Sequence, residues 1–142
     1  MRCVNRHRAN PLLTPSAITP SRPFLKVVGV FNPAAVVARG ETIIWFRVAE
    51  QFAARGDTAI VPRYVPATNA IEPVRLDLSD PAVDARDPRI IYKRETMYLT
   101  SISHIRSAVI RDGAVVSVSR DPVLAPTEAW EELGVEDPRI MA

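Results

Sequence analysis

The chain has 142 residues, of which 47% are apolar and 24% are charged, and this predicts one globular core rather than two. Its 18 Lys and Arg residues against 16 Asp and Glu residues leave a net charge of only +2. Nucleic-acid binding needs a clustered basic face. We therefore expect no nucleic-acid partner.

The N-terminal segment is basic and then rich in proline. MRCVNRHR is followed by ANPLLTPSAITPSRP rather than by a long apolar run, so we expect neither a signal peptide nor a membrane span. Cys3 is the only cysteine and cannot form an internal disulfide, and no Cys/His spacing resembles a metal site. These features predict a cytoplasmic protein without a bound metal.

Short runs rich in β-branched and aromatic residues follow, separated by turn signals such as ARGET, ARGDT and RDGA. Each run has the length of a strand. PTEAWEELG is the only helical-looking piece, in which Thr127 could cap a turn that ends at Gly134. The sequence predicts an all-β chain of short antiparallel strands. In chain order the runs are FLKVVGVF, TIIWFRVA, TAIVPRYV, PVRLDL, RIIYK, TMYLTSI, SAVI and AVVSVS.

The tetrapeptide DPRI occurs twice, at residues 87–90 and 137–140. A period of about 40 to 50 residues with about four strands per unit is typical of β-propeller blades. A small sandwich or barrel, complete in itself, fits the same strand pattern. The pattern alone leaves both architectures open.

Each DPRI copy places a carboxylate and a guanidinium near the start of a strand, because proline fixes the backbone between them. An Asp-Pro turn followed by a surface arginine is the simpler interpretation of a single copy. Arg86 precedes the first copy and is expected to keep Asp87 ionised, whereas Glu136 precedes the second and is expected to raise the pKa of Asp137. A raised pKa suits a proton donor, so Asp137 is the candidate acid.

Several stretches, taken together and in order, resemble the N-terminal part of the mannoside phosphorylases of glycoside hydrolase family 130. They are NPLLTP, VVGVFNPAAV, WFRVAE, DPRI with YLTSISHIRSAVIRDG, and PVLAPTEAWEELGVEDPRI, between residues 10 and 140. The resemblance implies a five-bladed β-propeller with a central pocket. This chain would supply blade one at about residues 10–75, blade two at about 76–135, and the first strand of blade three at 136–142.

Family members are longer than this chain, so the resemblance predicts an N-terminal portion that arises from a truncated reading frame, a split gene or a deliberately shortened piece. An open propeller fragment would expose unpaired strand edges. We therefore expect this chain alone to be inactive and prone to self-association, for example as a homo-oligomer.

Members of the family cleave β-mannosides with inorganic phosphate and invert the anomeric centre to give α-mannose 1-phosphate. Phosphate is already an anionic nucleophile, so one carboxylic acid suffices, whereas an inverting hydrolase needs a second carboxylate. The resemblance places the acid at Asp137, its proton relayed through a sugar hydroxyl, and a sugar or phosphate contact at Arg139. The implied ligands are a β-mannoside oligosaccharide or glycoconjugate and phosphate as co-substrate, with no cofactor and no membrane partner.

The resemblance extends to four further positions, each with a structural alternative. Asn32 in FNP and Arg47 in FRVAE match segments that line the pocket and would hold mannosyl hydroxyls. An Asx-turn and a surface strand residue are the respective alternatives. Asp87 and Arg89 would contact the aglycone sugar, or would form a structural turn.

The stretch SISHIRSA and two tryptophans complete the candidate set. Ser103, His104 and Arg106 could reach the pocket rim, although a lone histidine near a strand end is more often a hydrogen-bonded structural residue. Trp45 lies in the apolar run IIWF and is expected in the core, whereas Trp130 is the better candidate for stacking on a sugar. A mannoside hydrolase of the same family, an inactive relic and a non-catalytic carbohydrate-binding domain stay open as alternatives.

Overall fold

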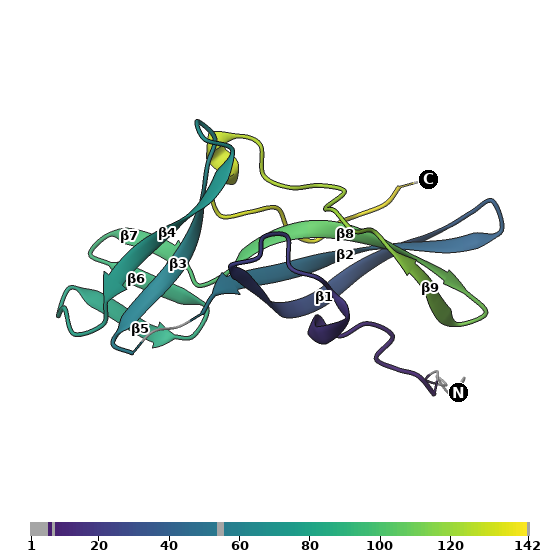
Figure 1. The fold of residues 1–142 in the computed structure, drawn as a ribbon, viewed down its shortest axis with the longest axis horizontal. Coiled ribbons are helices and arrows are strands. Elements are labelled where there is room, and N and C mark those ends of the chain that lie inside the picture. The colour runs from purple at the N-terminus through teal and green to yellow at the C-terminus, as the bar shows by residue number, and fades with distance from the viewer. Residues whose placement is uncertain (1–5, 7, 54–55, 142) are drawn as a thin grey trace.

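Figure 1 shows the computed structural model, which describes residues 6, 8–53 and 56–141. Cys3 lies outside the described residues. Nine strands and two single-turn 3-10 helices are present within these ranges. They are η1 (Pro15–Ala17), β1 (Leu25–Ala38), β2 (Glu41–Phe52), β3 (Thr58–Val65), β4 (Ala70–Asp77), β5 (Val83–Asp87), β6 (Ile90–Lys93), β7 (Thr96–Leu99), β8 (Ile102–Arg111), β9 (Ala114–Val118) and η2 (Ala129–Glu131).

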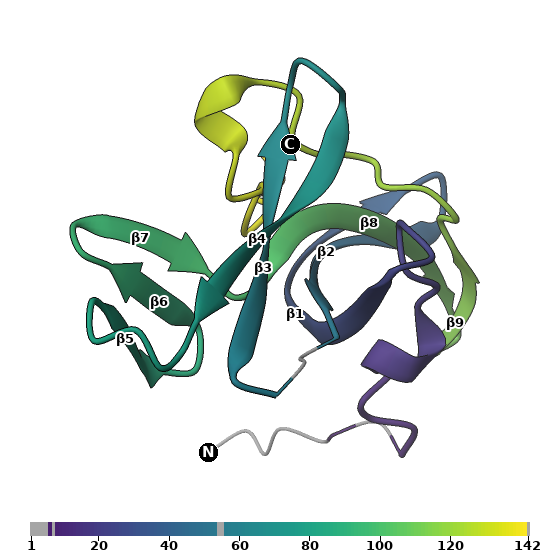
Figure 2. The same cartoon turned by 60° about the vertical axis from the view of Figure 1, so that its left-hand side comes forward.

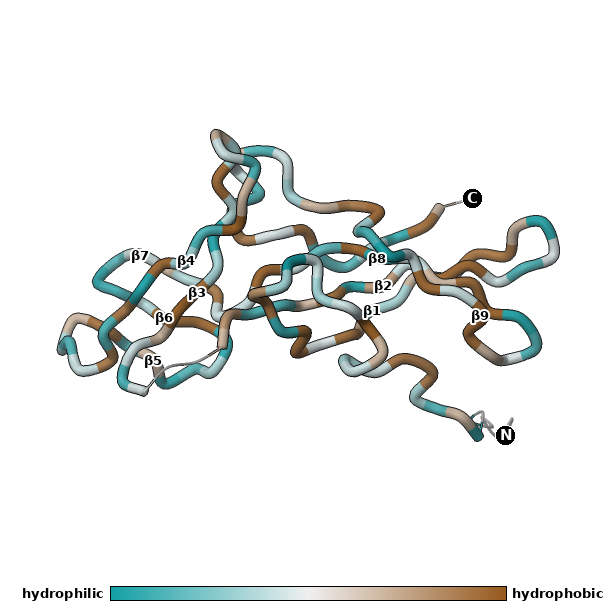
Figure 3. Tube along the Cα trace, viewed as in Figure 1, coloured by the Kyte–Doolittle hydropathy of each residue, from teal (hydrophilic) through white to brown (hydrophobic). Residues whose placement is uncertain are grey.

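The largest sheet has the strand order β1-β2-β8-β9 and consists of two hairpins joined through antiparallel pairing of β2 with β8. Turns of the sequence Arg-Gly and Asp-Gly close the hairpins, and all four turn residues have the positive φ that a tight two-residue hairpin turn favours. Hydrophilic residues colour these hairpin tips in Figure 3, while hydrophobic residues follow the strands.

Alternation along β2 separates the two faces of this sheet. Phe46 and Val48 are 1% and 0% exposed and pack with Ile18, Val27 and Ala108 in a hydrophobic cluster. Arg47, which lies between them in the sequence, is on the opposite face. This second face is the one that the C-terminal segment crosses in Figure 1.

Two smaller sheets, β3-β4 and β5-β6-β7, form the other end of the molecule, as Figure 2 shows from a second direction. Pro62 lies opposite Pro73 in the β3-β4 ribbon. A two-stranded ribbon has only edge strands and so tolerates proline. Val61, Leu76 and Ile91 form a second buried cluster that joins the two small sheets.

The prediction of an all-β chain is confirmed, and the three sheets do not close into a barrel. The four-stranded sheet pairs β2 with β8 across the blade boundary expected near residue 75. The five-bladed propeller stays a prediction. None of the helices in the described ranges is long and apolar enough to cross a membrane.

The turn predicted at PTEAWEELG is the short helix η2. It begins at Ala129 with Glu128 as its N-cap, so the prediction that Thr127 would be the cap is wrong. Thr127 instead donates its backbone N–H to the Glu131 carboxylate at 2.7 Å. Gly134 ends the turn as predicted, with φ 103° and its N–H donated to the Glu131 carbonyl at 2.8 Å.

Candidate active site

Arg47 lies at the centre of the face that the C-terminal segment crosses. Its Nε donates to Ser103 Oγ of β8 at 2.8 Å, and its guanidinium carbon lies 4.9 Å from the centre of the Phe31 ring on β1. One terminal nitrogen donates to Glu136, and the other lies 3.5 Å from Asp137 Oδ1. Its side chain is 16% exposed. Three strands and the C-terminal segment therefore hold this one guanidinium.

Asn32 brings a second polar group to the same carboxylate. Its Nδ2 donates to Asp137 Oδ1 at 2.8 Å, across 105 positions of the sequence. The pairing of β1 with β2 shifts register between Phe31 and Ala34, so Asn32 sits in a β-bulge, which re-aims a side chain away from the regular alternation. The structure thus brings together Asn32, Arg47 and Asp137, three of the residues predicted from the sequence.

The C-terminal segment that carries the candidate acid is held against β8 by its backbone. An isolated parallel bridge joins Gly134 to Ser103, and the Val135 N–H donates to the Ser103 carbonyl at 2.9 Å. A Cβ on Gly134 would lie 2.5 Å from both the N and the O of Ser103. This close approach needs glycine, and it places Glu136 and Asp137 beside Arg47.

The two DPRI copies differ in backbone structure. In the first, Asp87 ends β5 and pairs with Ile90, so Pro88 and Arg89 form a hairpin turn. In the second, Asp137 has φ 45° and belongs to no strand. The strand expected at the second copy is not present among the described residues, and the assignment of this segment to a third blade stays a prediction.

The pKa of Asp137 is lowered, contrary to the sequence prediction. The amide of Asn32 is the largest cause, and the charges of Arg47 and Arg139 lower the pKa further, while burial acts in the opposite direction. The expected effect of Glu136 is missing because that carboxylate pairs with Arg47. In the ligand-free protein, Asp137 is ionised at neutral pH.

Asp87 is ionised as predicted, but through a different arginine. Hydrogen bonds from the Arg89 side chain and backbone lower the pKa of Asp87. Arg86, the expected partner, pairs instead with Asp84 at 2.6 Å. The change follows from the hairpin turn, which folds the Arg89 side chain back over the carboxylate two residues before it.

A groove of about 570 Å³ runs from Arg47 and Glu136 to the turn of the first DPRI copy. Arg89 lines it, whereas Asp87 lines a neighbouring open pocket together with Arg89. The structure therefore places the first copy at one end of the groove and Glu136, beside the candidate acid, at the other. The groove is lined by Val28, Gly29, Phe31, Arg47, Ala49, Gln51, Pro88, Arg89, Ile90, Leu99, Thr100, Ser101 and Glu136.

Arg139, the remaining arginine of the second DPRI copy, is exposed. Its guanidinium donates to the carbonyl of Pro138 at 3.1 Å and, within the described part of the chain, makes no ion pair with a carboxylate. It thus differs from Arg47 and Arg89, which are each paired. Its charge contributes to the low pKa of Asp137.

His104 does not join this site. It alternates with Ser103 on β8 and is 4% exposed on the opposite face of the sheet. Its Nε2 accepts from Arg106 Nε at 3.1 Å, and its Nδ1 lies 3.6 Å from Glu50 Oε2. His104 and Ser103 both line a second small pocket of about 70 Å³, beside Tyr64.

His104 is part of a buried polar network. Arg106, 2% exposed, donates to the carbonyls of Thr19 and Ser119, and Ser21 donates its backbone N–H to Glu50. The network fastens the segment before β1 and the segment after β9 to the sheet. With these contacts, His104 is a hydrogen-bonded structural residue, the role that is more common for a lone histidine near a strand end.

Burial, followed by the charges of Arg106 and Arg22, lowers the pKa of His104 to about 4. The unfolded chain binds a proton at His104 below about pH 6.5, whereas the folded chain does not until about pH 4. The resulting stability is fully present above pH 6.5 and is lost as the pH falls toward 4. Between pH 7 and pH 5 we expect a loss of about 2 kcal/mol in the free energy of unfolding.

Urea unfolding at several pH values tests this prediction, with His104→Gln as the matched variant. Glutamine keeps a hydrogen-bond acceptor for Arg106 but does not titrate, so its stability should change much less between pH 7 and pH 5. An equal loss of stability in both proteins would contradict the assignment.

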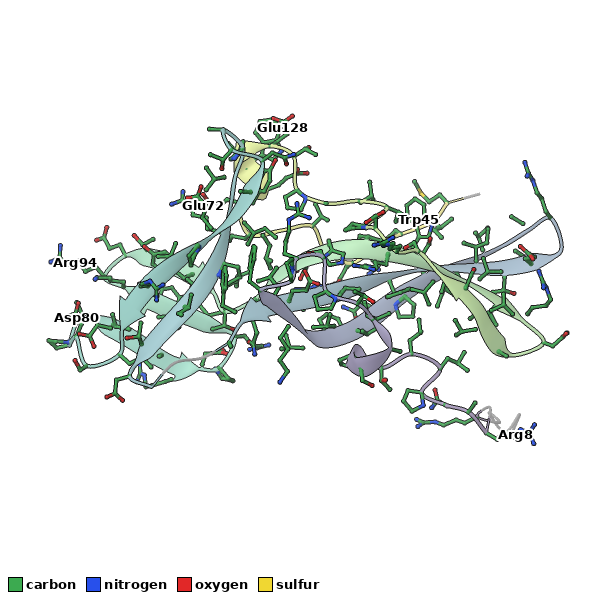
Figure 4. All side chains as sticks on the ribbon, viewed as in Figure 1. Arg8, Trp45, Glu72, Asp80, Arg94 and Glu128 are labelled. Carbon is green, nitrogen blue, oxygen red and sulfur yellow. The ribbon has the colours of Figure 1, made fainter. Side chains whose placement is uncertain are left out.

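Sequence reasoning misjudged Trp45 and missed two partners of Arg47. Trp45 was expected in the core, but Phe46 points there instead, and Trp45 is partly exposed on the Arg47 face, where Figure 4 labels it. Trp130 is 81% exposed on η2, which packs against β3. Phe31 and Glu136 were missed as partners of Arg47, because their contacts depend on register and on pairing across 89 residues, which no local pattern reports.

No protein-family model matches the chain. The chain is 31% identical to the β-1,2-mannobiose phosphorylase of Listeria innocua serovar 6a, in a match that covers 96% of this chain and 40% of that protein. The solved structure of β-1,2-mannobiose phosphorylase from Listeria innocua in complex with β-1,2-mannobiose matches with a TM-score of 0.89 over the same shares of the two chains. The chain thus spans less than half the length of the curated relative. Both matches confirm that this chain resembles the N-terminal portion of a mannoside phosphorylase of glycoside hydrolase family 130.

Proposed function

We propose that this chain supplies the acid-bearing part of the active site of a β-mannoside phosphorylase. The observation that carries the proposal is the convergence of Asn32 and Arg47 on the carboxylate of Asp137, next to the end of the groove that Arg47 and Glu136 line. A relative whose name specifies β-1,2-mannobiose phosphorylase supports the substrate class.

In the proposed reaction, a phosphate oxygen attacks the anomeric carbon of the mannosyl unit while the glycosidic C–O bond breaks. The leaving oxygen takes a proton that originates at Asp137, and the products are α-mannose 1-phosphate and the shortened sugar. Solvent then returns a proton to the carboxylate. Arg139, which lacks a carboxylate partner among the described residues, is the candidate contact for phosphate or sugar.

The low pKa of Asp137 in the free protein requires that ligands raise it. A phosphate anion near the carboxylate and the removal of water both favour the protonated form. Mannosyl hydroxyls that draw the guanidinium of Arg47 away from Asp137 would act in the same direction. We therefore propose that Asp137 acquires its proton in the ternary complex.

The residues that line the groove support the proposal that it binds sugar. Arg47 and Arg89 each face the groove already paired with carboxylates, so the groove offers polar groups with little excess charge. Such a lining suits neutral sugar rings. We propose that Arg89, with Asp87 behind it, contacts the aglycone sugar.

The test is turnover by the natural protein at its full length. β-1,2- and β-1,4-linked mannobioses are supplied with and without inorganic phosphate, and α-mannose 1-phosphate is followed by ³¹P NMR. We expect consumption only with phosphate. Consumption of a mannobiose in phosphate-free buffer would establish the hydrolase alternative, and the absence of both turnover and binding would overturn the proposal.

A further inference from the structure

Six non-glycine residues among those described have a positive φ, and they fall into two groups. Arg39, Asn69, Arg94 and Asp112 lie in turns that join consecutive strands, where such angles are expected. The other two are Asn32 at 49° and Asp137 at 45°, and neither lies in a hairpin turn. Backbone strain outside turns is concentrated at functional sites.

These two strained residues are also partners of each other. The bulge at Asn32 points its amide at Asp137, and the hydrogen bond of 2.8 Å from Nδ2 to Oδ1 joins them. Asparagine and aspartate are the residues that best tolerate a left-handed backbone. Asn32 and Asp137 are thus residue types that tolerate these backbone angles. Both angles occur at residues that take part in the hydrogen bond between the two side chains.

The two oxygens of the Asp137 carboxyl are not equivalent. Oδ1 accepts from Asn32 and lies 3.5 Å from Arg47 Nη1, whereas Oδ2 has no hydrogen-bond partner in the part of the chain that the structure describes. A proton on Oδ1 would face two donors, so the acid form places its proton on Oδ2. The orientation of the carboxyl therefore depends on the Asn32 amide.

We propose that Asn32 is a positioning residue that fixes the carboxyl of Asp137 and reserves Oδ2 as the oxygen that carries and delivers the proton. This inference rests on the proposed function of Asp137 as the acid. It differs from the role expected from the sequence, in which Asn32 holds mannosyl hydroxyls.

Asn32→Gly tests the inference, with Asn69→Gly as the matched control. Glycine tolerates the positive φ at both positions, and each substitution removes one side-chain hydrogen bond, to Asp137 or to Tyr64. In the proposed enzyme, Asn32→Gly should lower the plateau of kcat roughly tenfold to 100-fold while leaving KM for mannobiose nearly unchanged. The basic limb of the pH profile should move to higher pH. Asn69→Gly should change neither quantity.

A second readout does not depend on turnover. Carbon-13 NMR titration of the Asp137 carboxyl should give a higher pKa in Asn32→Gly than in the parent protein, and an unchanged pKa in Asn69→Gly. A raised KM with an unchanged pKa of Asp137 would show that Asn32 is only a sugar contact and would overturn the inference. Failure of all mannoside turnover with the pKa change intact would instead count against the proposed function alone.

Discussion

Replacement of Asp137 by Asn is expected to lower phosphate-dependent mannoside turnover by about 10² to 10⁴-fold, the range found for loss of a general acid. Asparagine has the same shape, tolerates φ 45° and still accepts from Asn32 through its carbonyl oxygen. The Asp137 side chain is 41% exposed, so the core is not disturbed. Steady-state kinetics and the thermal midpoint are measured together, and the midpoint should hardly change.

Asp87→Asn is the matched control, because Asp87 is followed by the same Pro-Arg-Ile sequence. It removes an exposed ion pair with Arg89 in a hairpin turn. Exposed pairs contribute little to stability. Because Asp87 holds the proposed aglycone contact Arg89, we expect any change to fall on KM for mannobiose, with kcat within a few-fold of the parent protein. If Asp137→Asn kept as much turnover as Asp87→Asn, the non-catalytic alternative would be supported.

Gly134→Ala is expected to lower turnover about 100-fold, because it moves the acid without changing any group of the site. The new Cβ would lie 2.5 Å from two backbone atoms of Ser103, which cannot move aside without disturbing β8. A φ of 103° adds backbone strain for alanine. The C-terminal segment should therefore leave its bridge to Ser103, and the contact between Asn32 and Asp137 should be lost.

Gly40→Ala is the matched control, because it adds backbone strain without displacing the C-terminal segment. Gly40 has φ 79° in the turn between β1 and β2, and a Cβ there would meet no atom within 4 Å. It should cost about 1 kcal/mol of stability and leave turnover unchanged. Amide hydrogen exchange at Val135 measures the bridge directly, and protection that is kept in Gly134→Ala would contradict this account.

The sequence pattern predicted where the strands lie better than it predicted which strands pair. Alternating apolar residues and turn signals marked β1 to β4, β6, β7, the second half of β8 and β9, whereas VDARD, with three charged residues in five, was not recognised as β5. The pairing of β2 with β8 joins residues about 60 positions apart, and nothing local reports it. The blade boundary expected near residue 75 stays a prediction.

The candidate site was predicted in its residues and misjudged in its electrostatics. Asn32, Arg47 and Asp137 were identified through resemblance and meet in the structure. The pKa of Asp137 was predicted from its neighbour in the sequence, but Glu136 faces Arg47 instead. His104 was named with Ser103 as a residue that could reach the pocket rim, although alternation along β8 directs the two side chains to opposite faces.

The central claim is that the groove between Arg89 and Glu136, beside Asp137, holds the β-mannoside. A crystal structure of the full-length protein with β-1,2-mannobiose tests it most directly, with Asp137→Asn used to prevent turnover. We expect one mannosyl ring within hydrogen-bonding distance of Arg47 and of residue 137, and the second ring toward Arg89. A sugar bound elsewhere, with the groove left to solvent, would contradict the account.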